Sequence, residues 1–265
     1  MTRIDPTLDT FLVDSTATTP SADAWGRMEG RAAPLDVHGI RGPVLALVPH
    51  ADDETLGFGG LLLTLSTLGV PVDFLLVTDG SQSHPGCTRF DAEARRTVRE
   101  NEFRDAVVEL GGELSRVRFW RKPDTRLPYP QTSAGREAVA ELREMLEEGQ
   151  YATVLTPWRH DPHGDHEATT ALLHAALTAD AKAPRVLEYC VWLGHQGSAL
   201  AFPEAEDLAI HRFAVDQDTQ LRKHAALLAH QSQFGKVFDD PTGFTIPQPL
   251  ADSVFSGAEY FIEQR

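Results

Sequence analysis

The sequence predicts an α/β fold built on a mostly parallel sheet with helices on both faces. Short runs of β-branched and other apolar residues alternate with helix-length segments along most of the 265-residue chain, and such alternation is typical of parallel sheets. A hydrophobic content of 42% is enough for a sizeable core. No linker, internal repeat or low-complexity tract divides the chain, so we expect one domain over residues 39–265.

Six short runs are candidates for strands because β-branched and large apolar residues are concentrated in them. They cover residues 44–48, 72–77, 116–120, 152–156, 185–192 and 208–213. We expect the first five to form the parallel part of the sheet. The sixth is expected to be an edge strand.

Five segments have the length and pattern of helices. They cover residues 54–68, 91–110, 138–148, 167–177 and 218–230. The first ends at Gly69, a residue type that commonly terminates helices. The second places Phe103, Ala106 and Leu110 at helical spacing before Gly111. The first four connect the parallel strands, and this order of elements predicts a Rossmann-like fold.

The segment before the first parallel strand has a different composition. Residues 1–38 contain many Thr, Ser, Pro and Asp residues and only scattered apolar ones. Because such a segment can bury little apolar surface, we expect an irregular N-terminal arm. The arm contributes no residue to the motifs described below.

The charge and the cysteine count narrow the class of partner. The formal net charge is -15 and the pI is about 5.1, whereas binding to nucleic acid or anionic membrane normally needs a basic surface. We therefore expect a small, neutral or cationic substrate, with no nucleic acid and no membrane as partner. Cys87 and Cys190 are too few for a disulfide framework, and the N-terminus shows no apolar signal segment. We expect a cytoplasmic protein, and a homo-oligomer is compatible with the sequence.

Two groups of metal-type side chains follow two of the predicted strands. His50-Ala51-Asp52-Asp53-Glu54 comes just after residues 44–48, and His160-Asp161-Pro162-His163-Gly164-Asp165-His166-Glu167 follows residues 152–156. In an open parallel sheet, sites form outside the carboxyl ends of the strands at a topological switch point. The two groups therefore predict a single metal site at this edge of the sheet.

Both groups carry recognisable signatures. The segments 49–54 and 163–166 resemble Pro-His-Pro-Asp-Asp-Glu and His-x-Asp-His, the signatures of the LmbE-like, or PIG-L, family of metal-dependent de-N-acetylases, with Ala51 in place of the usual proline. Supporting similarity covers residues 56–60, 78–85, 99–102 and 223–233. The resemblance spans roughly residues 43 to 235 and leaves both ends unmatched.

The resemblance implies that His50, Asp53 and His166 bind the metal. Two imidazoles and one carboxylate leave a coordination position open, as catalytic zinc sites do. We expect one divalent metal, Zn²⁺ first, with Fe²⁺, Co²⁺ and Mn²⁺ as alternatives that these ligands accept. The residues alone do not decide between His163 and His166, because both lie in a loop; the family pattern favours His166.

The resemblance also implies catalytic roles for Asp52 and His163. Asp52 corresponds to the general base that takes a proton from water beside the metal. His163 corresponds to the histidine that, as imidazolium, stabilises the oxyanion and protonates the leaving amine. The alternative, in which His50 and Asp53 merely cap the following helix, is disfavoured because two independent signatures match.

Other polar residues have a structural and a functional interpretation. For Glu54 we favour capping of the first helical turn over catalysis. For Asp165, capping and the orientation of a histidine have equal weight. For Arg99 we favour pairing with Glu102 over substrate binding.

The remaining candidates are weaker. Trp158 and Trp192 are expected in the core rather than stacked on a sugar. For His84, a solvated loop position and a sugar-binding one have equal weight. Helix packing explains Lys223, His230 and Gln233 as well as the family's late motif does.

These observations predict a zinc-dependent hydrolase that removes an N-acetyl group from an amino sugar, in an N-acetylglucosamine-type glycoside or glycoconjugate, and releases acetate. A deacylase acting on a non-sugar N-acyl metabolite is the alternative, and a carbohydrate-binding protein without turnover is a third. A dinucleotide-binding oxidoreductase is disfavoured, because the first strand ends in acidic residues rather than a Gly-x-Gly-x-x-Gly turn.

Overall fold

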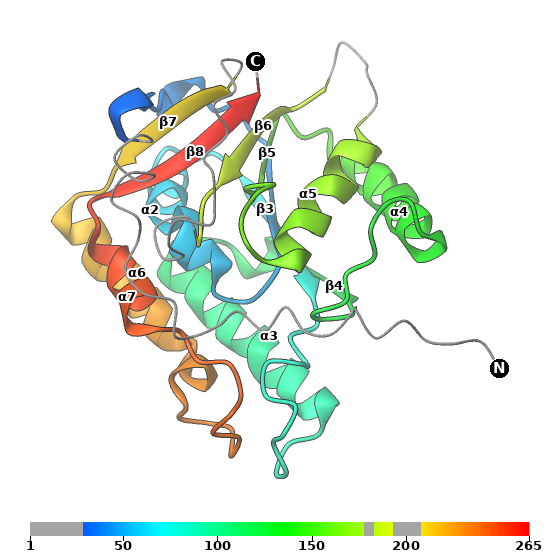
Figure 1. The fold of residues 1–265 in the computed structure, drawn as a ribbon. Helices are drawn as coiled ribbons and strands as arrows, with labels where there is room; N and C mark the ends of the chain where they lie inside the picture. The colour runs from blue at the N-terminus through cyan, green and yellow to red at the C-terminus, as the bar shows by residue number, and fades with distance from the viewer. Residues whose placement is uncertain (1–28, 178–182, 193–207, 265) are drawn as a thin grey trace.

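The computed structural model describes residues 29–177, 183–192 and 208–264 (Figure 1). Eight strands form one sheet in the order β1-β7-β8-β6-β5-β2-β3-β4. Their bounds are β1 Ala33–Pro34, β2 Val44–Val48, β3 Val72–Thr78, β4 Val117–Lys122, β5 Thr153–Pro157, β6 Arg185–Tyr189, β7 Leu208–Ala214 and β8 Ala258–Gln264.

Helices cover both faces of this sheet (Figure 1). The α-helices are α2 Asp53–Thr67, α3 Ala92–Glu109, α4 Ser133–Gly149, α5 Gly164–Ala176, α6 Gln217–Ala229 and α7 Gln248–Asp252. Four short 3-10 helices are η1 Val37–Gly39, η2 Leu114–Arg116, η3 Gln231–Phe234 and η4 Ser253–Phe255. In the described part of the chain, no helix is both long and apolar enough to cross a membrane.

Five strands form the parallel half of the sheet, and they confirm the predicted fold class. Val44 of β2 pairs with Val72 of β3 on one side and with Thr153 of β5 on the other, and all neighbours in β4-β3-β2-β5-β6 are parallel. The chain runs outward from β2 through β3 and β4, then returns to add β5 and β6 on the opposite side. The topological switch point therefore lies between β2 and β5.

Two hydrophobic clusters fill the space between the sheet and its helices. One joins α2, α3 and α6 to the sheet around Phe58, Phe74 and Phe103. The other joins α4 and α5 to the opposite face around Leu142 and Leu172. Alternate residues of β2 point to the two clusters, so this strand is buried on both sides.

The second half of the sheet differs from the prediction. The segment predicted as an edge strand, 208–213, forms β7 inside the sheet, with β1 on one side and β8 antiparallel on the other. The prediction was wrong because β1 pairs with the outer side of β7, and neither β1 nor β8 was predicted. β6 also ends at Tyr189 rather than Trp192.

Part of the predicted arm belongs to this half as well. β1 pairs with β7 in parallel, and Leu35 is buried in the core. The stretch 29–38 is therefore packed on the domain, while residues 1–28 lie outside the described part of the chain.

Candidate metal-dependent active site

The loops after β2 and β5 meet at the switch point and bring the two signatures together. Asp53 Oδ2 lies 3.3 Å from His50 Nδ1 and 3.2 Å from His166 Nε2. Asp53 and His166 are almost fully buried, and the His50 side chain is 18% exposed. One carboxylate and two imidazoles, predicted as ligands from separate parts of the sequence, thus converge on one point at the carboxyl ends of the strands.

The far nitrogen of each imidazole is held by a second carboxylate. His50 Nε2 lies 3.0 Å from Asp165 Oδ2, and His166 Nδ1 lies 2.8 Å from Asp161 Oδ2. A carboxylate in this position fixes the ring and the tautomer, so the other nitrogen keeps its lone pair for a metal. For Asp165, the orienting role considered from the sequence is the one that these contacts favour.

The buried His166 Nε2 provides a test of whether a metal fits. Although Asp53 Oδ2 is 3.2 Å away, this nitrogen makes no hydrogen bond within the described residues. Buried polar atoms normally have a partner. A divalent cation held by Asp53 and both imidazoles would supply one, and this donor set suits zinc and related transition metals.

His163 belongs to the same cluster but is held differently. Its ring centroid lies 4.5 Å from that of His50 and 5.0 Å from that of His166. It is the N-cap of α5, and its Nδ1 accepts a hydrogen bond from the Asp165 amide at 3.2 Å. Because Nδ1 is an acceptor, the proton of a neutral His163 is on Nε2. The ring nitrogens of all three histidines lie close enough to share an ion, but the contact with Asp53 is made by His166.

The two adjacent aspartates differ in pKa. Burial raises the pKa of Asp52 to about 6, even though Arg99 opposes the shift. Burial would also raise the pKa of Asp53, but His166 and His50 hold it well below its usual range. Asp53 is therefore a permanent anion, whereas Asp52 can exchange a proton near neutral pH.

Two histidines of the cluster, His166 and His163, also differ in pKa. Burial acts to lower the pKa of His166, but Asp53 and Asp161 raise it to about 9. For His163, burial and the neighbouring His50 and His166 lower the pKa to about 3. A metal at this site would have to displace any proton on His166, so metal binding is expected to be coupled to proton release.

Asp52 has an unusual backbone conformation. It is the N-cap residue of α2 with φ 138° and ψ -25°, and its side chain makes no capping hydrogen bond. Such a conformation costs a non-glycine residue about 1–3 kcal/mol and persists only where the surroundings impose it. Asp52 therefore occupies the N-cap position of α2 without capping the helix with its side chain.

Glu54 and Arg99 hold Asp52. Glu54 is fully buried and accepts the Asp52 amide at 3.0 Å, which agrees with the predicted role in the first helical turn. Arg99 pairs with Glu102 at 3.1 Å, as predicted, and also reaches Asp52 Oδ2 at 3.1 Å, which the sequence did not suggest.

The weaker candidates lie mainly in the core. Trp158 and Trp192 are buried, as predicted. A solvated position for His84 is wrong, because the ring is fully buried against Phe238. His230, predicted to be equally well explained by packing, contacts Glu54 at 2.8 Å.

Sequence reasoning missed the roles of Asp161 and Asp124. Asp161 lies within the second group of metal-type residues but was not separated from it. Asp124 follows β4, and its Oδ1 lies 3.6 Å from His50 Nε2. Its position just beyond the carboxyl end of a parallel strand was the signal that could have identified it.

Comparison with known proteins identifies relatives of this chain. Residues 45–177, about half of the chain, match the family profile described as "PIG-L: GlcNAc-PI de-N-acetylase". A diacetylchitobiose deacetylase from Thermococcus kodakarensis is 32% identical over 126 residues, which cover 46% of this chain and 44% of that protein. A probable N-acetyl-alpha-D-glucosaminyl L-malate deacetylase 2 from Bacillus anthracis is 26% identical over 196 residues, which cover 72% of this chain and 81% of that protein. The chain matches less than half the length of the first relative.

A solved structure supports the fold. The deacetylase in a bog complex, from the biosynthesis pathway of teicoplanin, superposes with a TM-score of 0.63 and covers 84% of this chain and 98% of that chain at 19% identity. At this identity the similarity concerns the fold alone. Together with the profile match, it confirms the resemblance drawn from the two signatures.

Proposed function

Because the chain belongs to the PIG-L family, whose profile is described as a GlcNAc-PI de-N-acetylase, we propose that it hydrolyses the N-acetyl group of an amino sugar and releases acetate. The proposed substrate is an N-acetylglucosamine-type glycoside or glycoconjugate. The main support is the convergence of both signatures on Asp53, which lies 3.3 Å from His50 and 3.2 Å from His166.

We propose that His50, Asp53 and His166 hold one divalent metal, most simply Zn²⁺. His166 Nε2, which has no hydrogen-bond partner among the described residues, and the carboxylates behind both imidazoles support this assignment. Fe²⁺, Co²⁺ and Mn²⁺ suit the same ligands. When bound, such a cation acts as a Lewis acid that polarises the amide carbonyl and lowers the pKa of water.

Asp52 is the proposed general base. Its carboxylate is adjacent in sequence to Asp53 but is turned to Arg99, so it is free of the proposed ligand set. A pKa of about 6 suits a group that takes a proton from the attacking water and later passes it to the leaving amine.

His163 is the proposed donor to the oxyanion. With Nδ1 accepting the Asp165 amide, its Nε2–H can donate a hydrogen bond while the ring is neutral. Burial and the neighbouring His50 and His166 lower the pKa of His163, which agrees with a neutral donor; the imidazolium that the family resemblance implies would donate from the same nitrogen. A preorganised donor of this kind stabilises charge that develops on the carbonyl oxygen.

The substrate class is supported by the relatives. Their names specify diacetylchitobiose and an N-acetylglucosaminyl malate, both N-acetylated sugars with a further group attached. We therefore propose that this chain also binds both the sugar and the group attached to it. Binding energy from that remote group would help to position the scissile amide.

The proposed setting is the cytoplasm, with a small molecule as the partner. Cys87 and Cys190 are free thiols, as expected in a reducing compartment. The charge of -15 argues against nucleic acid or anionic membrane as a partner. A homo-oligomer stays a prediction.

The decisive experiment measures acetate release from an N-acetylglucosaminyl conjugate, free N-acetylglucosamine and simple N-alkyl acetamides, with and without chelator. We expect about one divalent metal per chain by elemental analysis and no activity after its removal. The conjugate should have the highest kcat/KM and the acetamides should be near background. Acetamides that react as fast as the conjugate would instead support the non-sugar amidase, and full activity without metal would refute the proposal.

A further inference from the structure

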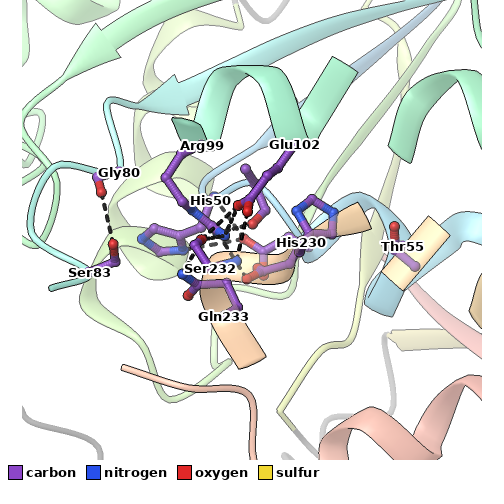
Figure 2. A network of polar contacts seen from close by, with 12 residues as sticks. His50, Thr55, Gly80, Ser83, Arg99, Glu102, His230, Ser232 and Gln233 are labelled. Carbon is purple, nitrogen blue, oxygen red and sulfur yellow. Dashed lines mark hydrogen bonds and ion pairs between the residues drawn. The ribbon is translucent and has the colours of Figure 1, made fainter. Parts of the chain in front are cut away.

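Two separate sets of contacts hold Asp52, and both lead to the same distant segment. This segment, His230–Gln233, comprises the C-cap residue of α6 and the first residues of η3. In Figure 2 the side chains of His230, Ser232 and Gln233 lie opposite Arg99 and Glu102. All but the exposed Gln231 are buried to at least 99%.

The first set fixes the backbone of Asp52. The Asp52 amide donates to Glu54 Oε2 at 3.0 Å. Glu54 Oε1 accepts from the Thr55 hydroxyl at 2.7 Å and lies 2.8 Å from His230 Nε2. Since Glu54 is fully buried, its carboxylate depends on these few partners, and among them His230 is the one that is distant in the sequence.

The second set fixes the side chain of Asp52. Arg99 Nη2 donates to Asp52 Oδ2 at 3.1 Å and to the carbonyl of Ala51. Arg99 Nη1 donates to Glu102 Oε2 at 3.1 Å and to the Ser232 hydroxyl at 3.2 Å. A single planar guanidinium therefore links the proposed base to Ser232.

Glu102 and Ser232 are themselves tightly joined. The Ser232 amide donates to Glu102 Oε1 and its hydroxyl donates to Oε2, both at 2.7 Å. Gln233 Nε2 donates to the same hydroxyl at 3.0 Å. Both carboxylate oxygens of Glu102 are thus used, which leaves Arg99 little freedom to turn away from Asp52.

We propose that the segment His230–Gln233 is a positioning element for the general base: His230, through Glu54, imposes the backbone conformation of Asp52, and Ser232, through Glu102 and Arg99, aims its carboxylate. The inference rests on the proposed function of Asp52. It explains how a non-glycine residue keeps φ 138° next to the metal ligands, since the contacts that impose it come from more than 170 residues away in the sequence. The segment contributes no atom to the reaction itself.

The test compares His230→Leu with His230→Gln. The first variant removes the contact with Glu54, and the second retains an N–H donor that can reach it. For His230→Leu we expect kcat to fall by about 10- to 100-fold, because a small misplacement of a catalytic group has effects of this size. KM should stay within about 2-fold and metal content should be unchanged, while His230→Gln should recover most of the activity.

A matched control and a milder variant complete the design. His211→Leu removes a histidine–carboxylate contact of 3.0 Å between His211 on β7 and Glu263 on β8, away from Asp52, and should leave kcat unchanged. Ser232→Ala deletes one hydroxyl of the second set and is the variant to use if His230→Leu fails to fold. We expect it to lower kcat by about 3- to 10-fold with metal retained.

The outcome can be separated from that of the proposed function. If the wild type releases no acetate from any N-acetylated compound, the proposed function fails, but the backbone of Asp52 can still be read in crystal structures of the wild type and His230→Leu. Loss of the positive φ in the variant supports the inference. An unchanged Asp52 together with wild-type kcat, or equal losses in His230→Leu and His230→Gln, would overturn it.

Discussion

The carboxyl ends of β2 and β5 in the parallel half of the sheet carry the proposed metal ligands, whereas the extension formed by β8, β7 and β1, in which β8 is antiparallel to its neighbours, carries none of them. The extension contacts α2, the helix that begins with the proposed ligand Asp53. Glu259 of β8 accepts the amides of Gly60 and Leu61 at 2.6 and 2.8 Å, after a break in α2 at Phe58. Since α2 begins with Asp53, the extension fixes the helix that presents the ligand.

The proposed metal ligands and the residues that hold them in place therefore come from different parts of the chain. The ligands occur in two short motifs, each within a few residues of a strand end. The supporting residues His230, Ser232 and Glu259 all lie in the last 36 residues of the chain, outside the two metal signatures. Their contacts involve buried carboxylates. We therefore expect substitutions of the proposed ligands to remove the metal, and substitutions of the supporting residues to leave the metal in place while they lower turnover or stability.

The largest effect is expected from Asp53→Ala in the parallel half. Even an outer carboxylate typically contributes about 10- to 100-fold to metal affinity, so loss of the ligand that faces both His50 and His166 should exceed this and reduce acetate release to background. Elemental analysis and isothermal titration measure the metal. Glu263→Ala removes a carboxylate from β8, and this variant should keep its metal. Equal metal loss in both variants would show that metal binding does not depend on the parallel half alone.

The next effect is expected from Asp52→Asn. Asparagine has nearly the same shape and tolerates positive φ, but it cannot take a proton at neutral pH. We expect kcat to fall about 100-fold or more, equivalent to about 2.7 kcal/mol or more, with metal retained. Steady-state kinetics and metal analysis on the same sample check this. If Asp52→Asn loses as much metal as Asp53→Ala, the assignment of base and ligand is wrong.

The sequence predicted the parallel half because its signals are local. Each of the five strands is a short run rich in apolar residues, helix-length segments connect them in turn, and sheet order then follows from these connections. The extension depends instead on pairing between β7 and β8, which are separated by α6, α7 and two 3-10 helices. No local pattern fixes such a pairing, so β8 was missed. β7 was placed at an edge because the two-residue strand β1, which covers its outer side, was missed as well.

The same distinction applies to the site. Both signatures could be recognised in the sequence because the residues of each are consecutive or nearly so. The link from His230 to Glu54 joins residues 176 apart, and the link from Ser232 to Glu102 joins residues 130 apart. Only the folded chain brings these pairs together, and the positive φ of Asp52 was likewise beyond what residue types could predict.

A smaller effect on turnover, but a large one on stability, is expected from Lys223→Met. Lys223 Nζ lies 2.6 Å from Glu259 Oε1, and both side chains are at most 3% exposed. Removing one partner of a buried ion pair leaves a buried charge and typically costs about 3–5 kcal/mol. Urea unfolding should detect this loss, whereas metal content and kcat per folded molecule should change little.

Arg185→Met is the matched control for this prediction. Arg185 pairs with Glu263 at 2.9 Å between neighbouring strands, but both side chains are about a quarter exposed. Pairs in such an environment usually contribute about 0–1 kcal/mol. If the two variants are equally stable, the Lys223–Glu259 pair does not have the supporting role assigned to it.

The smallest effect is expected from trimming the N-terminus in two steps. Deletion of residues 1–28 leaves β1 in place and removes no residue of either signature, so stability, metal content and kcat should stay near wild-type values. Deletion of residues 1–36 also removes β1 and Leu35, whose amide donates to the Arg212 carbonyl at 2.9 Å and whose side chain is buried. Burial of one leucine contributes about 2 kcal/mol, so the second truncation should unfold at lower urea concentration than the first. Both should bind metal, because the extension supports the site without forming it; a loss of metal after the first deletion would show that the arm takes part in the site.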